Sequence, residues 1–262
     1  PMSDDQLLTS LSGSGVLTLT INRPERRNAL SWDLVARMRS AVQAARDDSG
    51  VRVIVLTGAG DKAFCAGADL DTMAAGAGAF ALHEQRGQLA GLFLDLYEVG
   101  KPTIAKVRGF CLAGGFGLAT ACDLVVAAED ATFATPEINV GLWPFMITVP
   151  LTRSISPKKA LELMMTGRRI SAAEADSLGL LTRVVEAAEL DDEVRRLADE
   201  LASKSSAVMK LGRDSFYSVY GRNAADALAQ LHPLLSLNNT LADAAEGIAA
   251  FRDKREPEWT DG

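Results

Sequence analysis

The chain has 262 residues, of which 48% are hydrophobic and 23% charged, a composition typical of water-soluble globular proteins. Its 34 acidic and 27 basic residues give a net charge of -7, which argues against a nucleic-acid-binding protein because such proteins carry a basic face. No apolar run approaches the roughly 20 residues that span a bilayer. We therefore expect neither a nucleic acid nor a membrane as partner.

The cysteine and histidine content indicates a reducing compartment and no metal site. The three cysteines are odd in number and lie in apolar or glycine-rich stretches, which favours free thiols over disulfides. The two histidines, His83 and His232, belong to no cluster with metal-ligand spacing. The first residues lack the apolar run of a signal peptide. We therefore expect a cytoplasmic protein without a bound metal.

The first half of the chain predicts alternating strands and helices. Apolar and polar residues alternate over 15–22, which is typical of a strand, and the apolar spacing over 31–48 predicts a helix with Ser31 as its N-cap. Short β-branched runs predict buried strands at 51–58, 102–109 and 123–129. Between these strands the sequence predicts helices, around 84–98 and 115–122. Strands that alternate with helices indicate an α/β core.

Two further segments differ from this pattern. Residues 58–87 are rich in glycine and alanine without a firm period, which is compatible with an exposed loop or with a mobile wall over a pocket. After residue 157 the pattern is nearly continuous helix. The sequence therefore predicts an N-terminal α/β body followed by a helical section.

Two glycine-rich turns follow two of the predicted strands. AFCAGAD (63–69) comes after 51–58, and FCLAGGFG (110–117) comes after 102–109. Neither contains the Gly-Lys-Ser/Thr of a Walker loop, and the loose dinucleotide pattern at 58–63 is weak because no helix follows it directly. Backbone N–H groups at helix starts attract negative charge, so two facing turns can form an oxyanion hole. Tight packing of strand on helix is the alternative interpretation.

The chain also resembles the enoyl-CoA hydratase/isomerase family, the crotonase superfamily, over essentially its whole length. The matching pieces are INRPERRNALS, VRVIVLTGAGDKAFCAGADL, KPTIAKVRGFCLAGGFGLATACDLVVAAEDATFATPEINVGL, ALELMMTGRRISAAEADSLGLLTRVV and GIAAFRDKREPEW. The resemblance implies the α/β ClpP/crotonase fold, a spiral of ββα units with a C-terminal helical trimerisation region. On this basis we expect a core with the coenzyme and active sites over 1–200 and a helical oligomerisation region over 201–262.

The family's functional positions can be carried over residue by residue. They place the oxyanion donors at the backbone N–H groups of Ala68 and Gly114 and one catalytic carboxylate at Glu137. The apolar neighbours of Glu137 are expected to raise its pKa by desolvation. The resemblance further implies an acyl-CoA substrate, no tightly bound cofactor, and a homotrimer or a dimer of trimers.

One position departs from the pattern of the family's hydratases. Their other catalytic glutamate matches Gly117, which has no side chain. A single carboxylate suits transfer of a proton from C2 to C4 of a 3-enoyl thioester, which is the chemistry of a Δ3–Δ2-enoyl-CoA isomerase. Two alternatives stay open: an enoyl-CoA hydratase with an atypical site, whose second acid is absent or comes from 72–98, and a non-catalytic acyl-CoA-binding protein.

Two groups of residues complete the expected site. The residues expected to bind the coenzyme are Arg26, Arg27, Ala66, Asp69, Phe251 and Lys254. Asp69 is also expected to brace its own loop. Phe251 and Lys254 are expected to reach the coenzyme of a neighbouring subunit. The expected acyl pocket is lined by Leu70, Gly117, Trp143 and Phe145.

Overall fold

The larger of two sheets has six strands, five of which are neighbours in a parallel arrangement. The structure is a computed structural model that describes residues 5–69 and 78–261. The strands of the large sheet, in spatial order, are β1 (Leu7–Leu11), β2 (Val16–Ile21), β3 (Val53–Gly58), β5 (Thr103–Val107), β7 (Leu124–Ala128) and β10 (Arg183–Val185). Only β1 and β2 pair antiparallel in this sheet.

A smaller sheet lies beside the large one, and three of its strands each come next in the chain after a strand of the large sheet. Its four strands, in spatial order, are β4 (Ala63–Cys65), β6 (Phe110–Leu112), β8 (Thr132–Ala134) and β9 (Ile170–Ser171). The first three are parallel, and β9 pairs antiparallel with β8. The chain thus alternates between the sheets, with β3, β5 and β7 in one and β4, β6 and β8 in the other. This alternation is the expected spiral of ββα units.

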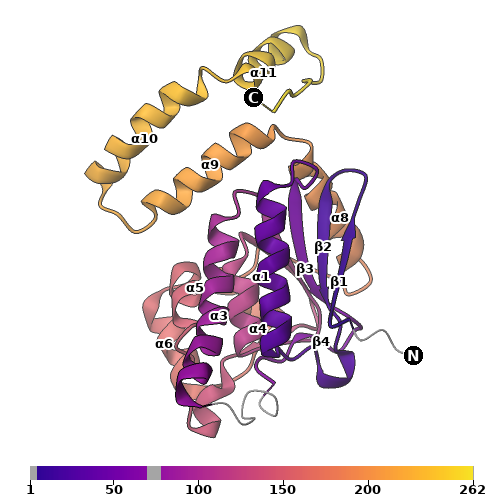
Figure 1. Cartoon of the computed structure of the whole chain (residues 1–262), viewed down its shortest axis with the longest axis vertical. Helices are drawn as coiled ribbons and strands as arrows, with labels where there is room; N and C mark the ends of the chain where they lie inside the picture. The colour runs from indigo at the N-terminus through magenta and orange to yellow at the C-terminus, as the bar shows by residue number, and fades with distance from the viewer. Residues whose placement is uncertain (1–4, 70–77, 262) are drawn as a thin grey trace.

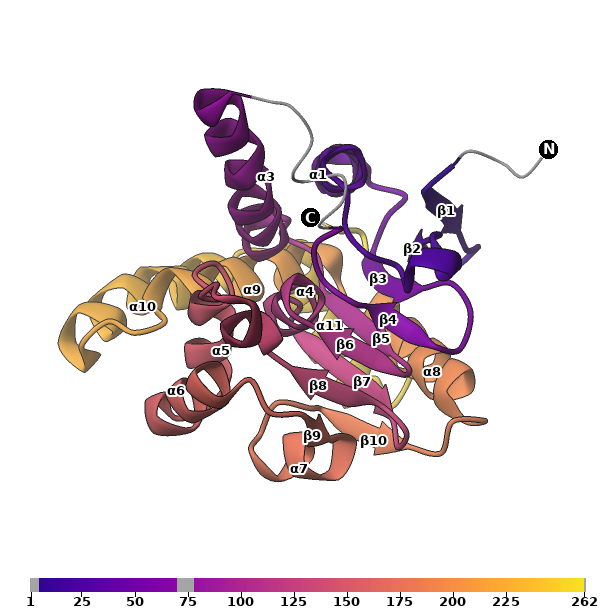
Figure 2. The same ribbon diagram turned by 90° about the horizontal axis from the view of Figure 1, so that it is seen from below.

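Helices cover both faces of the large sheet (Figure 2). On one face lie α1 (Trp32–Asp47), α3 (Ala79–Glu98) and α4 (Gly114–Ala121); on the other lies α8 (Leu190–Ala202). Within β3, Ile54 and Leu56 face the first group, whereas Val53 and Val55 face α8. Because successive side chains of a strand point to opposite faces, a strand covered on both sides must be apolar throughout.

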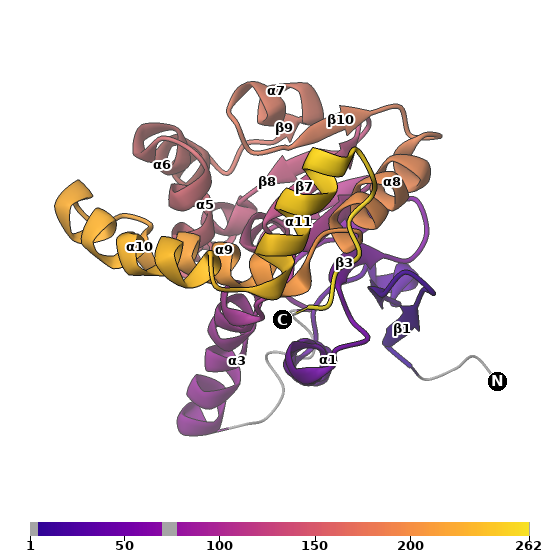
Figure 3. The ribbon, with the colours of Figure 1, turned by 90° about the horizontal axis from the view of Figure 1, so that it is seen from above.

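The remaining helices are short segments or belong to the C-terminal part of the chain. Between β2 and β10 the chain also forms the short helical segments η1 (Pro24–Arg26), η2 (Pro136–Val140), α5 (Thr148–Ser154), α6 (Pro157–Thr166) and α7 (Ala172–Ser177). The last three helices are α9 (Ser206–Val219), α10 (Ala224–Asn238) and α11 (Ala242–Asp253). They lie together at one end of the sheets, with α10 on the outer side of α9 (Figures 1 and 3).

Most of the predicted elements are present, and the differences are local. The Ser31 hydroxyl caps α1 by accepting a hydrogen bond from the Leu34 N–H at 3.2 Å, as expected. The structure adds β1, all four strands of the small sheet, and β10, which interrupts the expected run of helix after residue 157. The division of the chain into 1–200 and 201–262 stays a prediction.

Candidate active site

The two glycine-rich turns pack directly on each other. A Cβ placed on Gly67 would lie 2.5 Å from the Ala113 Cβ and 3.4 Å from the Gly114 nitrogen. A Cβ on Gly115 would lie 2.4 Å from the Cys65 carbonyl oxygen. Contacts under 3.0 Å are too short for real Cβ atoms, so Gly67 and Gly115 have no room for a side chain. These two glycines therefore allow the turn after β4 to rest on the start of α4.

The Ala68 amide faces away from the strand-like contact that holds its turn. The Leu30 N–H donates to the Gly67 carbonyl at 2.7 Å, and the Asp69 N–H donates to the Leu30 carbonyl at 2.8 Å. In a parallel bridge of this kind, the amide of the central residue points away from the partner. The Ala68 N–H is therefore directed to the side opposite Leu30, and Ala68 is exposed.

The Gly114 amide lies at the start of a helix. Gly114 is the first residue of α4, and the N–H groups of a first helical turn have no partner within the helix. The preceding residue, Ala113, has φ 50° and ψ -128°, a conformation that residues with a side chain rarely adopt. Its N–H donates to the Ala134 carbonyl at the end of β8 at 2.9 Å. The two turns that pack on each other thus carry the two amides expected to form an oxyanion hole, and their convergence on one oxygen stays a prediction.

Glu137 lies three residues beyond that hydrogen bond, at the start of η2. Its side chain is half-buried, and within the part of the chain that the structure describes, its Oε2 atom is buried without a hydrogen-bond partner. Desolvation raises the pKa of this carboxyl above its ordinary value, which is the expected direction. A carboxylate with a raised pKa and an unused oxygen can both accept and return a proton.

The space beside Gly117 is filled by apolar side chains. A Cβ on Gly117 would lie 2.8 Å from the Phe93 Cζ and 3.0 Å from the Ile147 Cγ1. Both Phe93 and Ile147 are almost completely buried in the main core. The position therefore lacks a carboxylate and also lacks the room for one. Sequence reasoning identified the missing glutamate but not the two residues that occupy its place.

The described residues hold neither a metal-ligand cluster nor a membrane-spanning helix. Over 5–69 and 78–261, no group of three or more metal-ligating side chains is close enough to hold an ion. In the same ranges, every helix is too short or too polar to cross a bilayer.

Comparison with known proteins identifies the family. The model of the enoyl-CoA hydratase/isomerase family matches residues 12–262. This chain belongs to that family. The human mitochondrial enoyl-CoA hydratase domain-containing protein 3 is 34% identical over 246 residues, which are 94% of this chain and 81% of the relative.

Solved structures of the enoyl-CoA hydratase/isomerase family share the fold. An enoyl-CoA hydratase from Mycobacterium smegmatis superposes with a TM-score of 0.94 at 37% identity, covering 98% of this chain and 99% of that one. An enoyl-CoA hydratase from Polaromonas sp. JS666 gives 0.91 at 32% identity, with coverages of 97% and 99%. The crotonase fold expected from the sequence is therefore confirmed, including its helical C-terminal region.

Within this family member, the expected coenzyme residues around β4 lie near one another. The Ala66 N–H donates to the Arg27 carbonyl at 3.0 Å, which leaves the half-buried Ala66 beside the loop that carries Arg26. The Arg27 guanidinium lies 5.7 Å from the centre of the Phe110 ring. Arg26 and Arg27 are both exposed. Their contact with a coenzyme stays a prediction.

Asp69 is engaged in a buried ion pair. Its carboxylate lies 2.6 Å from the Arg23 guanidinium, and the two side chains are only 3% and 11% exposed. Arg23 also donates to the Ala29 carbonyl at 2.6 Å, so the pair joins the 23–29 loop to the turn that carries Ala68. This geometry favours the expected bracing role of Asp69, and sequence reasoning missed Arg23. Direct contact of Asp69 with a coenzyme stays a prediction.

The other expected residues are spread over the structure. Trp143 is half-buried against the core, whereas Phe145 is 68% exposed. Phe251, in α11, is 86% exposed, and Lys254 follows that helix with φ 54°. Leu70 lies outside the described residues. No role of these residues in an acyl pocket or a neighbouring coenzyme site is tested by the geometry.

Proposed function

We propose that this protein is a Δ3–Δ2-enoyl-CoA isomerase. The observation that carries the proposal is the apolar filling beside Gly117, where a hydratase of this family needs its second glutamate. Phe93 and Ile147 would have to move before a side chain could be added to this position. The remaining acid, Glu137, has the half-buried environment and the raised pKa that suit reversible proton transfer.

The proposed reaction uses three groups. Glu137 removes a proton from C2 of a 3-enoyl thioester, and the electron pair spreads to the thioester oxygen and the adjacent double bond. The N–H groups of Ala68 and Gly114 stabilise the charge on that oxygen, each contributing about 3 kcal/mol in the transition state. The protonated Glu137 then gives its proton to C4, which moves the double bond to C2–C3 without any added atom.

A spectrophotometric assay with Glu137→Gln tests this proposal. Formation of the conjugated 2-enoyl thioester from a 3-enoyl thioester increases the ultraviolet absorbance, whereas hydration of a 2-enoyl thioester decreases it. We expect isomerisation by the parent protein and a loss of about 100-fold or more in kcat for Glu137→Gln. Near-normal isomerisation by the variant would contradict the role of Glu137.

The second candidate is an enoyl-CoA hydratase with an atypical site. The names of related proteins support it, since the similar structures from Mycobacterium smegmatis and Polaromonas sp. JS666 are both enoyl-CoA hydratases. Such a hydratase positions its water either without a second carboxylate or with another acid, and the acids of α3 offer little support for the latter. Asp95 is buried, at 2.7 Å from Arg39, and Glu84 and Glu98 are exposed. Faster turnover of 2-enoyl than of 3-enoyl thioesters would favour the hydratase.

The third candidate is a protein that binds acyl-CoA without turnover. It retains the donors at Ala68 and Gly114 and uses them only for binding. Tight binding of an acyl-CoA, measured by calorimetry, together with no product from either unsaturated thioester would favour this candidate over both enzymes.

The proposed substrate is an acyl-CoA thioester, with no tightly bound cofactor. The proposed assembly is a homotrimer or a dimer of trimers, and its support is the exposed apolar surface of the helical region. Five large apolar residues of this region are more than half exposed: Phe216, Leu228, Leu235, Ile248 and Phe251. The cytoplasmic setting stays a prediction, and some relatives are named as mitochondrial.

A further inference from the structure

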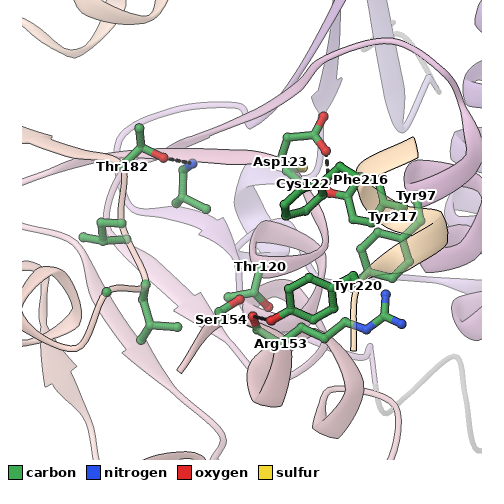
Figure 4. A pocket seen from close by; sticks show the side chains of 14 residues that line it. Tyr97, Thr120, Cys122, Asp123, Arg153, Ser154, Thr182, Phe216, Tyr217 and Tyr220 are labelled. Carbon is green, nitrogen blue, oxygen red and sulfur yellow. Dashed lines mark hydrogen bonds between the residues drawn. The ribbon is translucent and has the colours of Figure 1, made fainter. Parts of the chain in front are cut away.

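A cavity lies at the opposite end of α4 from the Gly114 amide. Its volume is about 240 Å³, and Thr120 and Cys122, at the end of the helix, form part of its wall. A helix of eight residues is about 12 Å long, so this cavity is separate from the two glycine-rich turns at the start of α4. Other walls come from α3, α5, α9 and residues 179–182 (Figure 4).

The wall of the cavity includes one exposed cation, Arg153. The Arg153 guanidinium lies 5.2 Å from the centre of the Tyr97 ring and 5.5 Å from that of Tyr220. The Tyr220 hydroxyl donates to the Arg153 carbonyl at 2.6 Å, which fixes the ring beside the guanidinium. Over residues 5–69 and 78–261, no carboxylate forms an ion pair with Arg153.

The other charged group in the wall, Asp123, is already neutralised. Its carboxylate lies 2.8 Å from the Arg213 guanidinium, whose side chain is 6% exposed. It also accepts hydrogen bonds from the Thr103 amide at 2.7 Å and from the Tyr217 hydroxyl at 2.5 Å. Because Asp123 and Arg213 cancel, the Arg153 charge makes the cavity net positive.

The rest of the wall suits an apolar body. Four aromatic rings, those of Tyr97, Phe216, Tyr217 and Tyr220, gather on the Arg153 side of the cavity (Figure 4). The Tyr97 hydroxyl is buried without a hydrogen-bond partner among the described residues. Burial raises its pKa to about 12, so it remains a proton donor at neutral pH. An unpaired buried hydroxyl is rare in native structures and needs an acceptor.

We propose that this cavity binds a small carboxylate with an apolar body. The Arg153 guanidinium pairs with the carboxylate, the aromatic rings contact the apolar part, and a small rotation of Tyr97 gives its hydroxyl an acceptor. The volume lies below the roughly 300–1,000 Å³ of sites for drug-sized ligands, which favours an acid of about one ring over a nucleotide. The site is independent of the proposed isomerase reaction.

Calorimetry with benzoate, cyclohexanecarboxylate and hexanoate tests the proposal, and the matching amides serve as neutral controls. We expect at least one acid to bind with a dissociation constant of about 1 mM or lower and its amide to bind at least tenfold more weakly. Arg153→Gln should weaken the binding of that acid about tenfold or more, and Tyr97→Phe about threefold. Arg195→Gln, on the exposed face of α8, should leave it unchanged.

Several outcomes would overturn the site. One is the absence of binding by all three acids up to about 10 mM. Another is equal affinity for acid and amide, or equal affinity in Arg153→Gln, whose folding is checked by its thermal midpoint. Ultracentrifugation adds a third: if Arg153→Gln dissociates an oligomer, the guanidinium belongs to a contact between subunits. None of these measurements depends on enzymatic turnover.

Discussion

Replacing Gly117 by alanine tests whether the space beside α4 is filled. Gly117 lies in the middle of a helix, where alanine is normally more stable by about 1 kcal/mol. Here the new methyl group would lie 2.8 Å from Phe93 and 3.0 Å from Ile147, and both belong to the packed core. Overpacking of this kind costs about 1–3 kcal/mol. We therefore expect Gly117→Ala to lower the free energy of unfolding by about 1 kcal/mol.

A second helical glycine provides the matched control. Gly212 lies within α9, and a Cβ there has no described heavy atom within 4 Å. Gly212→Ala should raise the free energy of unfolding by about 1 kcal/mol. Urea unfolding of both variants, followed by circular dichroism, should show shifts of opposite sign. If Gly117→Ala stabilises the protein as much as Gly212→Ala does, the position has free space and the argument against hydration loses its basis.

The remaining predictions concern pH and one ion pair. The pKa of Glu137 is raised, so isomerisation should decline as the pH falls through a value above 4.5, and the residual rate of Glu137→Gln should lack this decline. A hydrogen bond from Arg52 lowers the pKa of Asp261 to about 2. The stability that this pair contributes is present above pH 3.8 and is lost as the pH falls toward 2. Asp261→Asn should therefore show a smaller loss in its urea unfolding midpoint on acidification than the parent protein. Asp69→Asn leaves the Arg23 charge buried without the Asp69 carboxylate, and urea unfolding should show a loss of about 3 kcal/mol. A loss below about 1 kcal/mol would show that the pair contributes little to stability.

The sequence was sufficient to predict the long, regular elements. The central strands were recognisable because β3, β5 and β7 carry apolar residues on both faces, and α1 had both its apolar spacing and its Ser31 cap. The strands of the small sheet were missed for a physical reason. They have two or three residues each, too few to show a period, and β4 and β6 run directly into glycine-rich turns.

The sequence predicts those features of the site that depend only on which residue occupies a position. It does not predict the features that depend on which other side chains pack around that position. The absence of a carboxylate at Gly117 can be read directly from the sequence. That Phe93 and Ile147 fill the space depends on the packing of α3 and the start of α5 against α4, which no local pattern records. The same is true of the Arg23–Asp69 pair, whose members come from different loops.

The hydrogen bond from Ala113 to Ala134 has a consequence for how this scaffold changes its chemistry. It connects the start of α4 to the strand that leads into Glu137, so the amide donor and the acid are held by one rigid piece of main chain. Side chains around that piece can be exchanged without altering the spacing between donor and acid. If the proposed reaction holds, such a protein can acquire a new activity through a few substitutions around that piece, while the amide that binds the thioester oxygen is retained.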